Sequence, residues 1–216
     1  MSYQGKVYRK QGGDELVIAY GGLVTRIDSA GAEHSEPAAD LPGAVVAGKC
    51  TAVEELSGII HKTVLTLGLT GSSDLDLAGD ADNGTGIKVY DFPAGRILLL
   101  GAVIDASAVC NDAFNANPND VYKLGAGSVS ATQAAEGDLT STEQDIIPAT
   151  TIDTQGNTVL TNDWHNALGA SAQFDGTSSA LDLYINAAVL NASTTKAVTI
   201  AITGTLTLYW INLGDY

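Results

Sequence analysis

Four aspartates, Asp74, Asp76, Asp80 and Asp82, precede Asn83-Gly84 and could supply oxygen ligands to a metal ion. Ca²⁺ takes several carboxylate and carbonyl oxygens from one flexible loop, so this composition would suit it. The spacing does not fit an EF-hand, because the third alternating ligand and the distal glutamate are missing. We therefore expect a solvated acidic turn here and predict no metal site.

The other residues that could do chemistry are isolated in the sequence. The three histidines share no metal-ligand spacing: His34, His61 and His165. Asp163-Trp164-His165 suggests a catalytic cluster, but a tryptophan anchor with polar neighbours explains it better. The chain contains no Gly-x-Ser-x-Gly elbow, Walker loop or dinucleotide fingerprint.

Residues 12–16 (Gly-Gly-Asp-Glu-Leu) match the signature of diguanylate cyclases. That family needs a long α/β domain with the signature well inside it, whereas this match lies in the first turn of a short amino-terminal segment. A β-turn with a solvated acidic pair is the better interpretation. We predict no catalytic residues, no cofactor and no enzymatic activity.

The charge balance restricts the kinds of partner that the protein can bind. Ten basic residues stand against 25 acidic ones, a net charge of −15, which argues against binding to nucleic acid or to anionic membranes. Four of the ten cations nevertheless lie within the first 26 residues: Lys6, Arg9, Lys10 and Arg26. This end is either a solvated arm or an arm that docks on an acidic partner.

Neither a secretion signal nor a membrane span is evident. Residues 1–6 lack an apolar core, and no apolar run approaches the ~20 residues that a membrane span requires. We therefore expect the protein to be made and kept in a cytosol until something releases it. Cys50 and Cys110 are far apart and lack Cys-x-x-Cys spacing, so we expect two buried or idle thiols.

The sequence pattern predicts a mostly β protein. Hydrophobic residues make up 45% of the chain and charged residues only 16%, with 24 glycines and almost no helical sequence. Alternating apolar residues predict strands within 59–70, 181–186 and 197–213. Strands of this length without amphipathic helices indicate a β-sandwich of jelly-roll-like topology.

Residues 86–106 have the strongest pattern in the chain. Pro93 and Gly95 suit a β-turn between two strands, which predicts a hairpin. The consecutive apolar residues 97–100 indicate a central strand covered on both faces, or covered on one face and at an interface on the other. We expect this strand and the carboxy-terminal strand to share one core.

Three regions are predicted. Residues 1–28 form an extended N-terminal β arm of short strands, at 6–9, 15–20 and 23–27, separated by glycine pairs. Residues 29–48, rich in glycine, proline and alanine, form an irregular linker. Residues 49–216 form the β-sandwich, in which 51–57 could make a short helical turn.

Four stretches resemble structural proteins encoded near the capsid genes of tailed bacteriophages and prophages. They are residues 6–19, 86–98, 142–148 and 210–216, and they span the full length of the chain. The resemblance implies a virion component of the head decoration (cement) type, with no enzymatic residues to carry over.

The first functional hypothesis follows from that resemblance and from the basic arm. The protein would bind the outside of an icosahedral head as a homo-oligomer, which we expect to be a trimer, and would stabilise contacts between major capsid subunits. It would be made in the host cytoplasm and reside on the capsid surface. The expected capsid contacts are the arm residues Lys6, Tyr8, Arg9, Lys10 and Arg26.

The second hypothesis is a receptor- or glycan-binding module of a phage fibre or tail. Jelly rolls bind sugars with exposed aromatic side chains on a shallow face. The candidates in this sequence are Tyr90, Tyr122, Trp164 and Tyr184. A glycan depolymerase is a third alternative, and it would require two carboxylates converging in a groove.

Overall fold

The chain forms two compact units, Met1–Leu41 (the arm unit) and Pro42–Tyr216 (the body). The computed structural model describes residues 7–9, 16–18, 24–27, 33–36, 43–57, 60–77, 83–110, 121–132, 138–152, 160–168, 171–190 and 198–214. Most of these residues are in strands. Their helices are two 3₁₀ turns, η2 (Gly71–Ser73) and η3 (Ser141–Glu143), and no described helix is long enough to cross a membrane.

The arm unit contains two antiparallel hairpins. β1 (Val7–Arg9) pairs with β2 (Leu16–Ile18), and β3 (Val24–Ile27) pairs with β4 (Glu33–Glu36). The three short strands predicted here are confirmed. β4 was not expected because it has no apolar residue, and only its backbone pairing with β3 makes it a strand.

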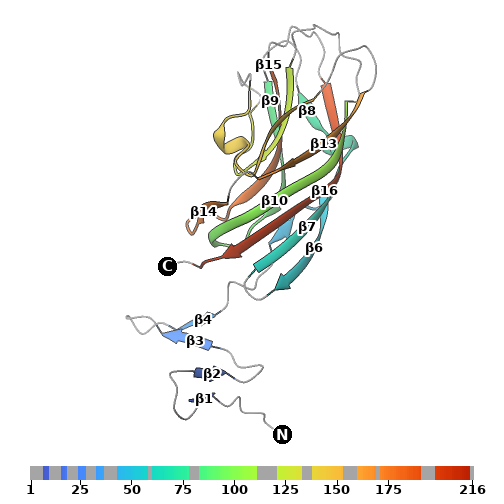
Figure 1. Cartoon of the computed structure of the whole chain (residues 1–216). Coiled ribbons are helices and arrows are strands. Elements are labelled where there is room, and N and C mark those ends of the chain that lie inside the picture. The colour runs from blue at the N-terminus through green and yellow to red at the C-terminus, as the bar shows by residue number, and fades with distance from the viewer. Residues whose placement is uncertain are drawn as a thin grey trace. The chain divides into compact units, whose positions relative to one another are not determined.

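The body is built from two antiparallel sheets (Figure 1). The seven-stranded sheet has the order β13-β10-β16-β7-β6, with β14 paired to β10 and β8 paired to β16. The bounds of its strands are β6 (Cys50–Ser57), β7 (Ile60–Leu69), β8 (Leu75–Leu77), β10 (Gly95–Cys110), β13 (Leu160–Ala167), β14 (Ala172–Gly176) and β16 (Val198–Asn212).

The five-stranded sheet has the order β12-β11-β15-β9-β5. Its strands are β5 (Ala44–Val45), β9 (Asn83–Asp91), β11 (Val121–Gly127), β12 (Ile147–Ile152) and β15 (Asp182–Leu190). Two predictions are wrong. The stretch 29–48, expected to be an irregular linker, contains the strands β4 and β5, and residues 51–57 of the sandwich lie in strand β6 rather than in a helical turn.

The strand order is that of a jelly roll. β7 and β8 lie in succession along one edge of β16, and β13 and β14 along one edge of β10, so each pair counts as one strand. The edge strands β5 and β6 lie outside this pattern. Numbered along the chain, the other eight strands have the order 1-8-3-6 in one sheet and 2-7-4-5 in the other. This double Greek key confirms the predicted all-β sandwich of jelly-roll-like topology.

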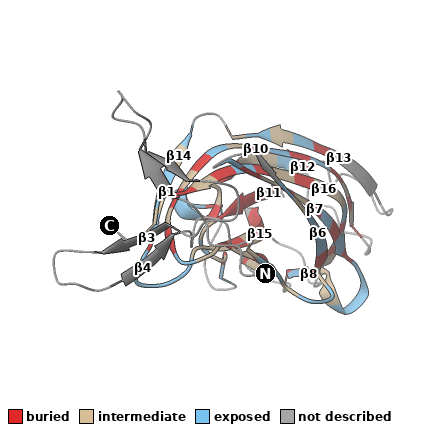
Figure 2. Ribbon diagram, turned by 90° about the horizontal axis from the view of Figure 1, so that it is seen from below, coloured by how far each residue is buried: buried red, intermediate tan, exposed pale blue. Residues whose placement is uncertain are grey.

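Apolar side chains from both sheets fill the space between them. Buried and less buried residues alternate along β7, β10 and β16 (Figure 2), as a strand with one face in the core requires. The predicted alternation of Leu65, Leu67 and Leu69 is confirmed, since all three are buried. β10 and β16 pair over most of their length, which confirms that they share one core.

The predicted hairpin at residues 86–106 is wrong. β9 pairs with β15 and β5, while β10 pairs with β16, β13 and β14, so the turn between them crosses from one sheet to the other. The side chain of Phe92 explains the crossing. It is buried between the sheets, with its ring edge-on to Tyr90 and Trp210 at centroid distances of 5.1 and 5.5 Å.

Gly95 has a φ of 123°, a backbone conformation that favours glycine, as its predicted place in a turn suggests. A Cβ atom there would lie 2.4 Å from Oδ1 of Asn212. The apolar run that follows has one buried face, because Ile97 and Leu99 are buried while Leu98 is half-buried and Leu100 is exposed. Within the described body, this strand is therefore covered on one face only.

Candidate interaction surfaces

The arm unit carries the predicted capsid contacts. Tyr8 and Arg9 lie on β1, opposite Val17 and Leu16 of β2. Arg26 lies on β3, opposite His34 of β4. Lys6 and Lys10 lie outside the described residues. The backbone thus places Arg9 and Arg26 in separate hairpins, so they are not neighbours on one strand.

Most of the described lysine and arginine side chains of the body form ion pairs with acidic side chains of the body itself. Nζ of Lys62 lies 3.0 Å from Oε2 of Glu55, and Lys123 pairs with Asp138. Lys88 bonds both Asp91 and, at 2.9 Å, Oδ1 of Asp182. The hydrogen bond to Asp91 is the main cause of the raised pKa of Lys88.

One sheet face of the body is covered. Residues 128–132 and 138–146, here called the covering segment, lie over the outer face of the five-stranded sheet. Asn186 of β15 anchors them, with no exposed surface. Its Oδ1 accepts a bond from the Ala131 N–H at 3.0 Å, and its Nδ2 donates to the carbonyl oxygens of Val129 at 2.9 Å and Glu143 at 2.8 Å.

Glycines allow this close approach. A Cβ atom on Gly86 would lie 2.2 Å from Oδ1 of Asn186, and one on Gly127 would lie 2.3 Å from the Thr142 carbonyl oxygen. Gly86 and Thr142, which are far apart in the sequence, therefore both lie at the covering segment. Asn186 cannot be recognised from the sequence alone, because a buried polar residue in an alternating strand has the same pattern as a solvated one.

The covering segment is also held by its own polar groups. Thr140 and Glu143 form a capping box at η3, in which the Thr140 N–H donates to Oε2 of Glu143 at 2.6 Å. The N–H and the hydroxyl of Ser128 donate to the two carboxylate oxygens of Asp145 at 2.8 and 2.7 Å. Burial of Asp145 raises the pKa of its carboxyl group.

The outer face of the seven-stranded sheet, here called the open face, has no described segment of the body across it. Its cross-strand pairs form rows, and the central row joins Ala167, Val103, Thr207, Val64 and Val53. Val103 is 49% exposed and Val53 60% exposed.

The neighbouring rows of the open face are also largely uncharged. Tyr209, Leu100 and Gly101 lie on one side of the central row, and a row of threonines lies on the other: Thr51, Thr66 and Thr205. The charged residues form two pairs. Lys62 pairs with Glu55, and His165 Nδ1 lies 3.0 Å from Oδ1 of Asp105.

A polar network is buried between the sheets behind the open face. Nε1 of Trp210 donates to Oγ1 of Thr63 at 2.8 Å, and Thr63 donates to Oε2 of Glu54 at 2.6 Å. His61 lies with Nδ1 2.9 Å from Oε1 of Glu54 and stacks on Trp210 at 3.9 Å. Because His61 is only 1% exposed, this His–Glu pair cannot reach a substrate in solution.

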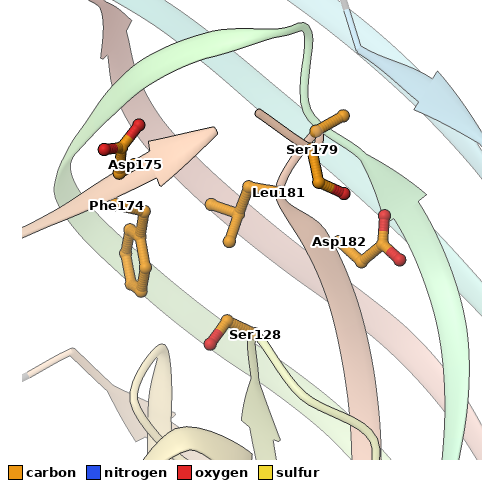
Figure 3. A pocket seen from close by; sticks show the side chains of 7 residues that line it. Ser128, Phe174, Asp175, Ser179, Leu181 and Asp182 are labelled. Carbon is orange, nitrogen blue, oxygen red and sulfur yellow. The ribbon is translucent and has the colours of Figure 1, made fainter. Parts of the chain in front are cut away.

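A shallow hollow of about 360 Å³ opens at the start of β15 (Figure 3). In that view Leu181 lies between Phe174 and Asp182. Three polar side chains that line the hollow, those of Ser128, Asp175 and Asp182, have hydrogen-bond partners within the chain. Oδ1 of Asp175 accepts two bonds from Thr177, and Asp182 accepts bonds from Lys88 and, at 3.0 Å, from the Tyr184 hydroxyl.

The aromatic residues proposed for glycan binding are mostly in the core. Tyr90, Tyr122 and Trp164 have at most 1% exposed surface, so they cannot form a sugar-binding face, and only Tyr184 is half-buried. Burial raises the pKa of Tyr90 to about 12, and its hydroxyl accepts the Gly43 N–H at 2.9 Å. Alternate residues of a strand face opposite sides of the sheet, and these three rings lie on the side that faces the core.

The predicted metal and thiol features can also be placed. Asp76 lies in β8 and Asp74 just before it, while Asp80 and Asp82 fall outside the described residues. The described residues contain no group of three or more histidine, cysteine or acidic side chains placed to hold a metal ion. Cys50 and Cys110 are free and buried, as expected.

No protein-family model, no curated protein and no solved structure matches this chain, so its fold and surfaces are the basis for inferring its function.

Proposed function

We propose that this protein is a phage head decoration (cement) protein that binds the outer surface of an icosahedral head and stabilises contacts between major capsid subunits. It would act as a homo-oligomer without enzymatic activity, after synthesis in the host cytoplasm. The observation that carries the proposal is the division of the chain into a small arm unit with a concentration of cations and a strongly acidic jelly-roll body.

The charge count supports this division of roles. Residues 1–27 hold four of the ten cations and only two of the 25 acids, residues 28–41 hold four acids and no cation, and residues 42–216 hold six cations and 19 acids. Three of the body's lysines pair with acids of the body itself. Residues 1–27 of the arm unit are therefore the part of the chain best suited to an acidic partner surface, and the capsid shell is the partner that we propose.

A bound arm would strengthen the shell by mass action. Packed DNA pushes outward on the contacts between capsid subunits. A protein that binds across several assembled subunits, and not to separated ones, raises the free energy needed to part them. An interface of standard size, about 1,600 Å² in total, would suffice for stable attachment.

The test is binding to purified heads that lack the protein, measured by co-sedimentation. The variant Arg9→Gln/Arg26→Gln removes two arm charges, and Arg96→Gln/Lys123→Gln removes the same charge from the body. We expect the arm variant to weaken binding about tenfold or more and the control to bind as the parent does. Equal loss in both variants, or no loss in either, would contradict the role of the arm.

A receptor- or glycan-binding module remains the second candidate. The observation in its favour is the hollow with Phe174, because an aromatic ring beside acidic and hydroxyl groups suits a sugar. Copy number separates the two functions. A decoration protein should approach the abundance of the capsid subunit in purified particles, whereas a fibre-tip module should be present in far fewer copies.

A further inference from the structure

The open face is the outer face of the seven-stranded sheet, and its central row carries no charge. β7 in this sheet is ten residues long, about 33 Å at the usual rise per residue, and five strands at about 4.8 Å spacing give a width of about 24 Å. The product is about 800 Å², which is the area that each partner contributes to a stable interface of standard size.

The composition of the open face indicates what can cover it. The central row and the two rows beside it contain valine, alanine, threonine, glycine, leucine and tyrosine, and their charged side chains form the pairs Lys62–Glu55 and His165–Asp105. Covering these three rows would therefore bury Lys62 together with Glu55 and Asp105 together with His165. Val53 and Val103 would gain most from burial, because they are among the most exposed large apolar residues described.

The area of the open face favours a second copy as the partner, because two such faces together would bury about 1,600 Å², the size of a stable interface. At −15, two copies repel each other over most orientations. The open face reduces this repulsion, because Lys62 offsets the charge of Glu55 there. It is also flanked by threonines that can form hydrogen bonds across the interface.

We propose that two copies of this chain associate open face against open face. Twisted sheets that pack in this way keep their strands within about 30° of each other. A face that packs on its own copy is an isologous contact and closes with two chains, so the structure favours a dimer over the trimer expected from the sequence. This dimer would form without a capsid, so its existence does not depend on the proposed function.

The test is the mass of the full-length protein in solution, measured by sedimentation equilibrium over a range of concentrations. Val103→Glu and Val53→Glu place a carboxylate on the open face from two different strands. Val129→Glu is the matched control, because Val129 is 47% exposed and lies on the covering segment over the other sheet. Circular dichroism and thermal unfolding establish that each variant is folded.

We expect the parent and Val129→Glu to show twice the chain mass of 22.1 kDa at micromolar concentration. Val103→Glu and Val53→Glu should each raise the dimer dissociation constant about tenfold or more. A monomeric parent would overturn the proposal, and this is also the result expected if the arm unit of the same chain covered the face. A dimer or trimer that both face variants leave intact would overturn it as well.

Discussion

Asn186 gives the sharpest test of how the body is held together. The substitution Asn186→Ala removes three hydrogen bonds, to the Ala131 N–H and to the carbonyl oxygens of Val129 and Glu143. Each net bond contributes about 1 kcal/mol, and the groups left behind are buried. We therefore expect the free energy of unfolding to fall by about 3 kcal/mol, which lowers the Tm by roughly 6–12 °C for a chain of this size.

The assay combines urea unfolding, followed by circular dichroism, with amide hydrogen exchange resolved by residue. In the variant, the amides of Ser128, Ala131 and Thr140 should exchange faster, because the covering segment opens without unfolding of the sandwich. Amides in the middle of β16 should lose protection only as far as the free energy of global unfolding falls.

The control is Asn166→Ala. Nδ2 of Asn166 donates to the Pro148 carbonyl oxygen at 2.8 Å and to Oγ1 of Thr150 at 3.0 Å, but the residue is only half-buried. Water can replace these bonds, so we expect a loss of about 1 kcal/mol or less. If Asn186→Ala costs no more than this control and leaves exchange in the covering segment unchanged, the role assigned to Asn186 is wrong.

Three further predictions concern the core and its titratable groups. Gly204→Ala should destabilise the protein by at least about 2 kcal/mol, because its φ is 146° and a Cβ would lie 2.4 Å from Cα of Ala106, whereas Gly68→Ala, with 3.9 Å of clearance, should be tolerated in chemical unfolding. Burial raises the pKa of the Cys110 thiol to about 11, so thiol reagents at pH 8 should label it only after unfolding, and stability should fall above pH 9 as the unfolded chain loses this proton first. Asp145 has a raised pKa when folded, so its contribution to stability is greatest below the usual pKa of about 4 and decreases as pH rises through the folded value, and Asp145→Asn should flatten that part of the pH profile of stability.

The strands of the core could be predicted because their signal is local. Leu65, Leu67 and Leu69 alternate with small or polar residues, and Leu206 and Leu208 alternate with threonines, so one buried face was evident. The all-β class and the jelly-roll topology followed from many such strands without helices. β4 was missed because its sequence has no apolar residue to alternate.

The crossing at Phe92 could not be predicted, because Pro93 and Gly95 suit a hairpin and a crossing equally well. What decides between them is the packing of Phe92 against Trp210, a residue more than a hundred positions away. The open face could not be predicted either, because it also depends on residues far apart in the sequence. Val53, Val64 and Val103 become neighbours only through the register of β6, β7, β16 and β10, which local pattern does not give.

The position of β16 affects how the chain can fold during synthesis. The last strand of the chain lies in the middle of the larger sheet, between β10 and β7, and it also carries β8. Until β16 has emerged from the ribosome, the edges of β10 and β7 that it joins therefore stay unpaired. The sandwich can close only once β16 is present, through contacts of long sequence separation, so its folding should be slow and should fail in any chain that terminates before β16.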